Sequence, residues 1–401
     1  MAMARLGVTL AALVWLGACS EDGKCDGNKE YPSCSALDEG DGGQDAGGPD
    51  GGGEADAAVA LNFDEFDSVI DQFLTEKMLA GATVAVVHKT RGIVHERGYG
   101  SFNKGRISLI ASSSKILSVG VLMALADAGK LDLDKPVSGY LQAWGNHKTD
   151  ITTAMLVSNS SGLVSLTQNP YYAPYICQYT EGGDLKSCSQ TIYSAADEAD
   201  RVPVDSMFKY GGGQWQLAGG VAEVVSGKSW ADLIKETYVT PCGVASLGYT
   251  NQFQKAAGTG YPMFFTGDVA TLPVTQNPSI EGGAYVSAGD YAKLLQMHLR
   301  GGLCGDQRVL SEAAVERMQA DRIKEKYNGS TPSAAMAGYG LGWWIDRDHP
   351  GVVVDPGAYG AVAWLDKQHE YGGFVVLEAT SAVGTELFAK LKPVADAVFD
   401  D

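Results

Sequence analysis

The hydrophobic and polar positions divide the chain into a polar N-terminal stretch and a longer segment with regular apolar periods. Between residues 63 and 74, apolar side chains recur at helical spacing and predict an amphipathic helix. Segments 83–88 and 92–99 then have the composition of two strands joined by a short turn. Three further strands and a last amphipathic helix are predicted near the C-terminus, at 340–345, 361–365, 373–378 and 387–398.

The middle of the chain, roughly 120–310, has mostly helical periods separated by long loops. Strands therefore lie at both ends of the folded segment, with helices outside and between them. This order predicts a mixed α/β (α+β) fold. We expect one antiparallel sheet formed by both chain ends and flanked by terminal helices, with a large, mostly helical inserted region.

The first residues have the pattern of an export signal. Arg5 precedes an apolar run, 6–18, which is too short to span a bilayer and is typical of a secretory signal. The run ends in Leu16-Gly17-Ala18-Cys19, which resembles the bacterial lipobox; an ordinary signal peptide is the alternative. We expect residues 1–18 to be a lipoprotein signal peptide and Cys19 to carry lipid. Ser20 then favours an outer-membrane anchor in the bacterial cell envelope, facing the periplasm or the exterior.

Charge separates a second segment from the rest. Between residues 20 and 60, eleven acidic residues and two lysines give a net charge of −9, half of the chain's −18. This stretch has almost no large apolar side chains and cannot bury enough surface to fold. We interpret 19–60 as an acidic, Gly-rich tether and 61–401 as the folded domain. The folded domain has no Lys/Arg cluster, so nucleic acid is not an expected partner; the membrane is expected to be contacted through the lipid anchor only.

The cysteine count favours disulfides. If Cys19 takes lipid, six of the seven cysteines remain, and six allow fifteen pairings. No Cys-x-x-Cys or His-x-x-x-His spacing occurs, so no metal site is predicted. Pairing the neighbours in sequence is the natural choice, which gives Cys25–Cys34, Cys177–Cys188 and Cys242–Cys304.

A Ser-x-x-Lys pattern supplies candidate chemistry. It occurs three times, at Ser101…Lys104, Ser112…Lys115 and Ser206…Lys209. Only the pair Ser112 and Lys115 opens a long apolar run, 116–125, that predicts a buried helix. Residues i and i+3 share a helix face, and a lysine desolvated by burial loses its proton more easily and can activate a serine. An ordinary polar helix start is the alternative.

Further segments follow this pair in a fixed order. Asp150-Ile151-Thr152 through Asn159-Ser160-Ser161-Gly162-Leu163 is similar to an "IT…LL…HTSGL" segment, with Asn159 in place of histidine. Residues 208–219 are similar to "FxYSNxGYxLLG", 282–290 to "GGLxSTAxD", and 339–343 match "YGLGW". Together, over residues 62–400, they resemble the serine β-lactamase / penicillin-binding protein superfamily. The class C-like group, with its family VIII carboxylesterases and D-Ala-D-Ala peptidases, is the most similar.

The resemblance implies a serine hydrolase without cofactor or metal. Ser112 would attack a carbonyl carbon, while Lys115 and Tyr210 shuttle the proton. The backbone amides of Ser112 and Ala358 would form an oxyanion hole, and Gly357 would let its strand approach the substrate. Water would then resolve the acyl-enzyme.

Two departures bear on the substrate. Gly212 stands where the Tyr-x-Asn motif has asparagine, and Asp355-Pro356-Gly357 stands where Lys-Thr-Gly or His-x-Gly is usual. We interpret Asp355 as a strand-end turn residue whose charge would repel a substrate carboxylate. The expected substrate is therefore a neutral ester or amide. Alternatives are a catalytically inert, lipid-anchored penicillin-binding-like module, and a D-Ala-D-Ala peptidase or β-lactamase with a peptidoglycan-like substrate.

Overall fold

The structure is a computed structural model that describes residues 61–166, 168–169, 171–251, 261–262, 264–323 and 336–400. The expected signal peptide and tether, with Cys19, Cys25 and Cys34, lie outside the described residues. Within these ranges, no helix has both the length and the apolar character needed to cross a membrane.

Seven strands form one antiparallel sheet in which the two ends of the described chain are neighbours. The strand order is β2-β1-β12-β11-β10-β9-β8, so β1 pairs with β12. In β1, Val84 and Val86 face one core while Ala85 and Val87 face the other, because successive side chains of a strand point to opposite faces. The fold class expected from the sequence is therefore confirmed. The strand bounds are β1 Gly81–His88, β2 Gly92–Gly100, β8 Gly338–Tyr339, β9 Trp344–Ile345, β10 Val352–Pro356, β11 Ala361–Asp366 and β12 Tyr371–Val376.

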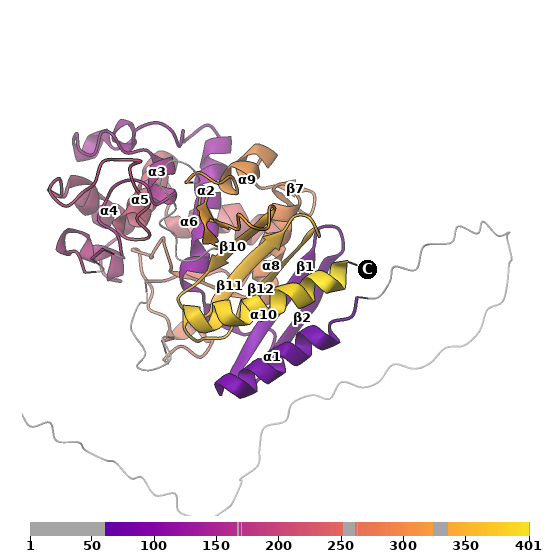
Figure 1. Ribbon diagram of the computed structural model, residues 1–401. Helices are drawn as coiled ribbons and strands as arrows, with labels where there is room; N and C mark the ends of the chain where they lie inside the picture. The colour runs from indigo at the N-terminus through magenta and orange to yellow at the C-terminus, as the bar shows by residue number, and fades with distance from the viewer. Residues whose placement is uncertain are drawn as a thin grey trace, which may run out of the picture. The chain divides into compact units, whose positions relative to one another are not determined.

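Helices cover both faces of this sheet. The terminal helices α1 (Asp64–Lys77) and α10 (Ser381–Phe399) lie together on one face (Figure 1). On the other face, α8 (Ala288–Leu299) packs against β1 and β12, and the ring of Tyr291 stacks on Phe374 with centroids 4.0 Å apart. The helix α2 (Lys115–Asp127) belongs to the same core as α8. Lys115 lies in α2 on this second face, whereas Tyr210 packs against the core of the first face.

Between β2 and β8 the chain is mostly helical, as the sequence predicts. Short strands add a three-stranded antiparallel sheet, β3-β5-β4, and a β6-β7 hairpin. The remaining bounds are β3 Ile107–Leu109, α3 Thr153–Val157, α4 Leu185–Ser194, α5 Gly213–Ser226, α6 Trp230–Ile234, α7 Thr240–Cys242, β4 Gly248–Tyr249, β5 Ala284–Ser287, β6 Leu303–Cys304, β7 Gln307–Arg308 and α9 Glu312–Met318.

Two disulfides fasten the helical region, and both were expected. Cys177 bonds to Cys188 with Cα atoms 5.6 Å apart. Cys242 bonds to Cys304 with Cα atoms 5.0 Å apart. The pairing of Cys25 with Cys34 lies outside the described residues and stays a prediction.

The C-terminal strands differ from the expectation at one place. Of the segment predicted as a single strand at 340–345, residues 340–343 are instead a turn between the short strands β8 and β9, and only Trp344–Ile345 forms a strand, β9. Gly342 lies in this turn with φ +84°, a left-handed conformation that breaks a regular strand. The strand β10, which the apolar pattern did not predict separately, follows directly and borders the site.

Candidate active site

The Ser112 segment begins as a tight 3-10 turn, Ala111–Ser114, and continues directly as α2. Ala111 has φ +47°, a left-handed conformation that alanine rarely adopts and that tertiary contacts must hold. One such contact is the Ser113 hydroxyl, which donates to the Asp355 carbonyl oxygen over 2.7 Å. The nucleophile turn is thereby fastened to β10.

Lys115 lies beside Ser112, as the i, i+3 spacing predicts. Its Nζ atom donates to Ser112 Oγ over 3.2 Å and to the Glu281 carbonyl oxygen over 2.9 Å, and the side chain is 1% exposed. Burial lowers the pKa of Lys115, but interactions with the side chains of Tyr210, Glu281 and Asp355 raise it more, so the net pKa lies above the ordinary value. The expectation that burial alone leaves a weakly held proton is therefore wrong, because three neighbours outweigh desolvation.

Tyr210 completes a cluster of three polar side chains. Its side chain interacts with those of Ser112 and Lys115, and Lys115 Nζ lies 4.7 Å from the centre of its ring. The ring stacks on Trp344 with centroids 5.4 Å apart. Burial raises the pKa of Tyr210 more than Lys115 lowers it, so the side chain is a neutral phenol that can donate a proton.

Asn159 holds the loop that carries Tyr210. Its Oδ1 accepts hydrogen bonds from the Gly211 N–H at 3.0 Å, from Gln214 Nε2 at 2.9 Å and from Trp215 Nε1 at 2.9 Å. Asn159 itself has φ +57°, a conformation that asparagine tolerates better than most residues. The sequence showed Asn159 as a departure from histidine but gave no role for it.

Gly212 is fixed in a conformation that only glycine adopts readily. It precedes α5 with φ +92° and ψ −168°. A Cβ atom there would lie 2.7 Å from the Val164 carbonyl oxygen. The asparagine that is absent from this position therefore cannot be restored without moving the loop.

Glu281 is a site residue that the sequence reasoning missed. Its side chain is buried, and its Oε2 atom lies 3.7 Å from Lys115 Nζ and accepts the Gly212 N–H over 3.2 Å. Burial raises the pKa of Glu281 more than Lys115 and the Gly212 N–H lower it. The available signal was its position, immediately before the Gly282-Gly283 pair of a family segment.

Asp355 lies inside β10, paired with Ala363 and fully buried, rather than in a strand-end turn. Within the described chain, neither carboxyl oxygen makes a well-formed hydrogen bond, although the Ile116 N–H and Lys115 both act on it. Burial dominates and raises the pKa of Asp355 well above its ordinary value. A neutral carboxylic acid does not repel an anion, so the expected repulsion of a substrate carboxylate is not supported. What remains is the absence of a cation at this position.

Gly357 and Ala358 follow β10 at the nucleophile turn. A Cβ atom on Gly357 would lie 2.1 Å from the Ile110 carbonyl oxygen and 3.2 Å from Ser113 Oγ, so the two backbones are in direct contact. Ala358 is exposed directly after this contact. The structure therefore places Gly357 against the turn that contains Ser112, and Ala358 follows it in the chain.

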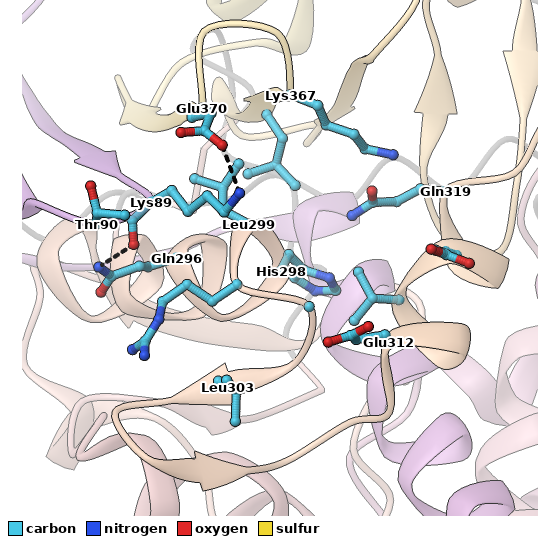
Figure 2. A pocket seen from close by; sticks show the side chains of 15 residues that line it. Lys89, Thr90, Gln296, His298, Leu299, Leu303, Glu312, Gln319, Lys367 and Glu370 are labelled. Atoms are coloured by element: carbon cyan, nitrogen blue, oxygen red, sulfur yellow. Dashed lines mark hydrogen bonds and ion pairs between the residues drawn. The ribbon is translucent and has the colours of Figure 1, made fainter.

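Two other features lie apart from this cluster. A hollow of about 800 Å³ is lined by His298 and Gln319 among others, and none of the three candidate catalytic side chains borders it (Figure 2). In the described part of the chain, Asp366, His369 and Asp396 could together bind a metal ion. Lys392 already donates to both carboxylates there and offsets one of their two charges.

Comparison with known proteins agrees with this architecture. Residues 66–391 match the family described as Beta-lactamase, and the chain belongs to that family. Penicillin-binding protein 4 of Amycolatopsis lactamdurans is 25% identical over 346 residues, which cover 80% of this chain and 86% of that protein.

Solved structures show the same fold. The octameric penicillin-binding protein homologue from Pyrococcus abyssi superposes with a TM-score of 0.63 at 22% identity, over 82% of this chain and 76% of that one. EstCE1, a hydrolase with promiscuous acyltransferase activity, superposes with a TM-score of 0.66 at 18% identity, over 83% of this chain and 97% of that one.

Proposed function

We propose that this protein is a serine hydrolase that cleaves an ester or amide through an acyl-enzyme on Ser112. The observation that supports it most is the contact of Lys115 Nζ with Ser112 Oγ at 3.2 Å, with the Tyr210 ring centre 4.7 Å from the same Nζ atom. A nucleophile within hydrogen-bonding reach of a base, which a third group orients, is the arrangement that covalent catalysis needs.

In the proposed reaction, the minority form of Lys115 that lacks one proton accepts the Ser112 proton as Oγ bonds to the carbonyl carbon. Tyr210, a neutral phenol, then protonates the leaving group and is reprotonated by Lys115. The N–H groups of Ser112 and Ala358 stabilise the oxyanion. Water attacks the acyl-enzyme by the reverse proton path and releases the acid.

A small neutral ester or amide is the proposed substrate class. The support is the missing cation at position 355, where a substrate carboxylate finds no lysine. The name of EstCE1, a hydrolase with acyltransferase activity, is consistent with it.

We also propose that the protein is exported and anchored by lipid at Cys19 in the cell envelope, so that a peptidoglycan-like substrate is within reach.

Turnover on a substrate panel tests this proposal. The rates of hydrolysis of short p-nitrophenyl esters, nitrocefin and a D-Ala-D-Ala peptide are measured with the wild-type enzyme and with Ser112→Ala. We expect ester hydrolysis that depends on Ser112 and exceeds nitrocefin turnover. Nitrocefin hydrolysis far above ester hydrolysis would overturn the substrate class, and ester hydrolysis that survives in Ser112→Ala would overturn the mechanism.

A second candidate is a penicillin-binding-like module that no longer turns over. The changes at Gly212 and Asp355 favour it, since both alter segments that normally face the substrate. Such a module would show no turnover of any panel member. It would instead bind a fluorescent penicillin, either without covalent attachment or as an acyl-enzyme that is not hydrolysed.

A further inference from the structure

One carboxylate connects the two halves of the proposed catalytic cluster. Glu281 precedes β5 and is 6% exposed. Its Oε2 atom faces the Lys115 ammonium group at 3.7 Å on one side and accepts the Gly212 N–H at 3.2 Å on the other. The same residue also accepts a hydrogen bond from Lys115 at its backbone carbonyl oxygen, over 2.9 Å. Lys115 is thus held from two directions by a single residue.

The loop beside Tyr210 leaves room for this carboxylate because it has no side chains there. Gly211 and Gly212 both have positive φ angles, +75° and +92°. A Cβ atom on Gly211 would lie 3.0 Å from Glu281 Oε2. The two glycines and the glutamate therefore fit each other.

Two buried carboxyl groups compete for the single ammonium group of Lys115. Glu281 has an N–H donor and direct contact with Lys115, whereas Asp355 has no well-formed hydrogen bond among the described residues. A buried charge is tolerated only when it is paired and hydrogen-bonded. Glu281 is accordingly the ionised partner of Lys115, and Asp355 is the neutral one.

We infer that Glu281 is a positioning residue of the proposed reaction. Its carboxylate fixes the Lys115 amine against Ser112, ties α2 to the loop that carries Tyr210, and sets the pH at which Lys115 becomes a base. This inference rests on the proposed Ser-Lys-Tyr chemistry. It adds a residue that lies outside the family segments recognised in the sequence, the nearest of which begins at Gly282.

The direction of the effect follows from charge. A carboxylate next to an ammonium group stabilises the protonated form and raises the pKa of Lys115. The substitution Glu281→Gln removes that charge while keeping the shape of the side chain. The pKa of Lys115 then falls, so that neutral Lys115 is available at lower pH. Because the acid limb of kcat/KM reports the essential base of the free enzyme, that limb moves to lower pH.

The experiment is a kcat/KM profile between pH 6 and pH 11 on a p-nitrophenyl ester with spontaneous hydrolysis subtracted, because the wild-type limb lies above the ordinary pKa of lysine. For Glu281→Gln we expect the acid limb to move down by at least about one pH unit, which is a tenfold change per unit. Glu281→Asp keeps the charge, and its limb should stay near that of the wild type. An acid limb that does not move in Glu281→Gln overturns the inference, whether or not the rate falls uniformly across the pH range.

Glu223→Gln is the matched control. Glu223 is also a buried glutamate that accepts a backbone N–H, from Trp230 over 2.7 Å, and burial raises its pKa, but it has no contact with Lys115 in the described structure. Its profile should superpose on the wild type. A limb that moves equally in Glu223→Gln also overturns the inference. If the wild type itself has no Ser112-dependent hydrolysis, the proposed function fails. If the wild type is active but the acid limb does not move in Glu281→Gln, only the inference about Glu281 fails.

Discussion

Gly357 offers a sharp test of how β10 serves the nucleophile. The substitution Gly357→Ala adds one methyl group at the contact between β10 and the turn before Ser112. The new Cβ would lie 2.1 Å from the Ile110 carbonyl oxygen, whereas ordinary contacts begin near 3.4 Å. The atom it meets belongs to the backbone and cannot rotate away. The strand and the turn must therefore separate by about 1 Å.

Such a displacement affects catalysis as well as stability. Overpacking of this kind destabilises a protein by about 1–3 kcal/mol. A misplacement of about 1 Å at a catalytic centre lowers the rate roughly 10²-fold, and loss of one oxyanion donor lowers it by about 10²–10³. Because the Ala358 N–H lies directly after the contact, we expect kcat to fall about 10²-fold with a smaller change in KM.

The assay is steady-state ester hydrolysis at a temperature well below the unfolding midpoint, with the midpoint measured in parallel. Gly182→Ala is the control, because Gly182 has an ordinary backbone conformation and no atom within 4 Å of the added methyl group. Its rate should match the wild type. A Gly357→Ala enzyme that folds and retains wild-type kcat would refute the close approach of this strand as a catalytic requirement.

Three further changes test other parts of the account. Tyr210→Phe keeps the ring on Trp344 but removes the hydroxyl group, so ester kcat should fall about 10²- to 10⁴-fold with little change in the unfolding midpoint; a fall below tenfold contradicts the role. Burial lowers the pKa of His298 to about 3, so the folded protein keeps it neutral while the unfolded chain protonates it below about pH 6.5; stability is then lost as pH falls from about 6.5 towards 3, by about 1.4 kcal/mol per unit. Neither ring nitrogen of His298 has a hydrogen-bond partner among the described residues, so His298→Phe should flatten this part of the urea-unfolding profile, and an unchanged slope between pH 6 and pH 4 contradicts it. Asn159→Ala leaves two buried donors, the Gly211 N–H and Trp215 Nε1, without their acceptor, whereas Gln214 Nε2 keeps two carbonyl oxygens, so the free energy of unfolding should fall by about 2 kcal/mol or more; Asn159→Asp keeps the acceptor and should lose less.

The sequence predicted the architecture well because its signals are local. Apolar periods gave the terminal helices and β1, β2, β11 and β12, and the Ser112 helix follows directly from its apolar run. The turn at Gly342 was missed, since a conformation forced by neighbouring elements leaves no periodic trace. Close spacing in the sequence was sufficient to pair Cys177 with Cys188.

The electrostatics of the site could not be predicted in the same way. The protonation of Lys115 depends on Glu281, which lies more than 160 residues away in sequence and meets Lys115 only in the folded protein. Likewise, an aspartate in the sequence is expected to carry a negative charge, whereas burial inside β10 keeps the carboxyl group of Asp355 neutral. Local patterns locate such residues, but the protonation state is set by the tertiary environment.

Covalent labelling of Ser112 tests the central claim most directly. Incubation with a fluorophosphonate, followed by intact-mass measurement and peptide mapping, should show one adduct for each chain, on the peptide that contains Ser112. Ser112→Ala should show none, while Ser101→Ala and Ser206→Ala, which remove the serines of the other two Ser-x-x-Lys matches, should label like the wild type. Absence of an adduct on the wild type, or an adduct that persists in Ser112→Ala, would contradict Ser112 as the nucleophile.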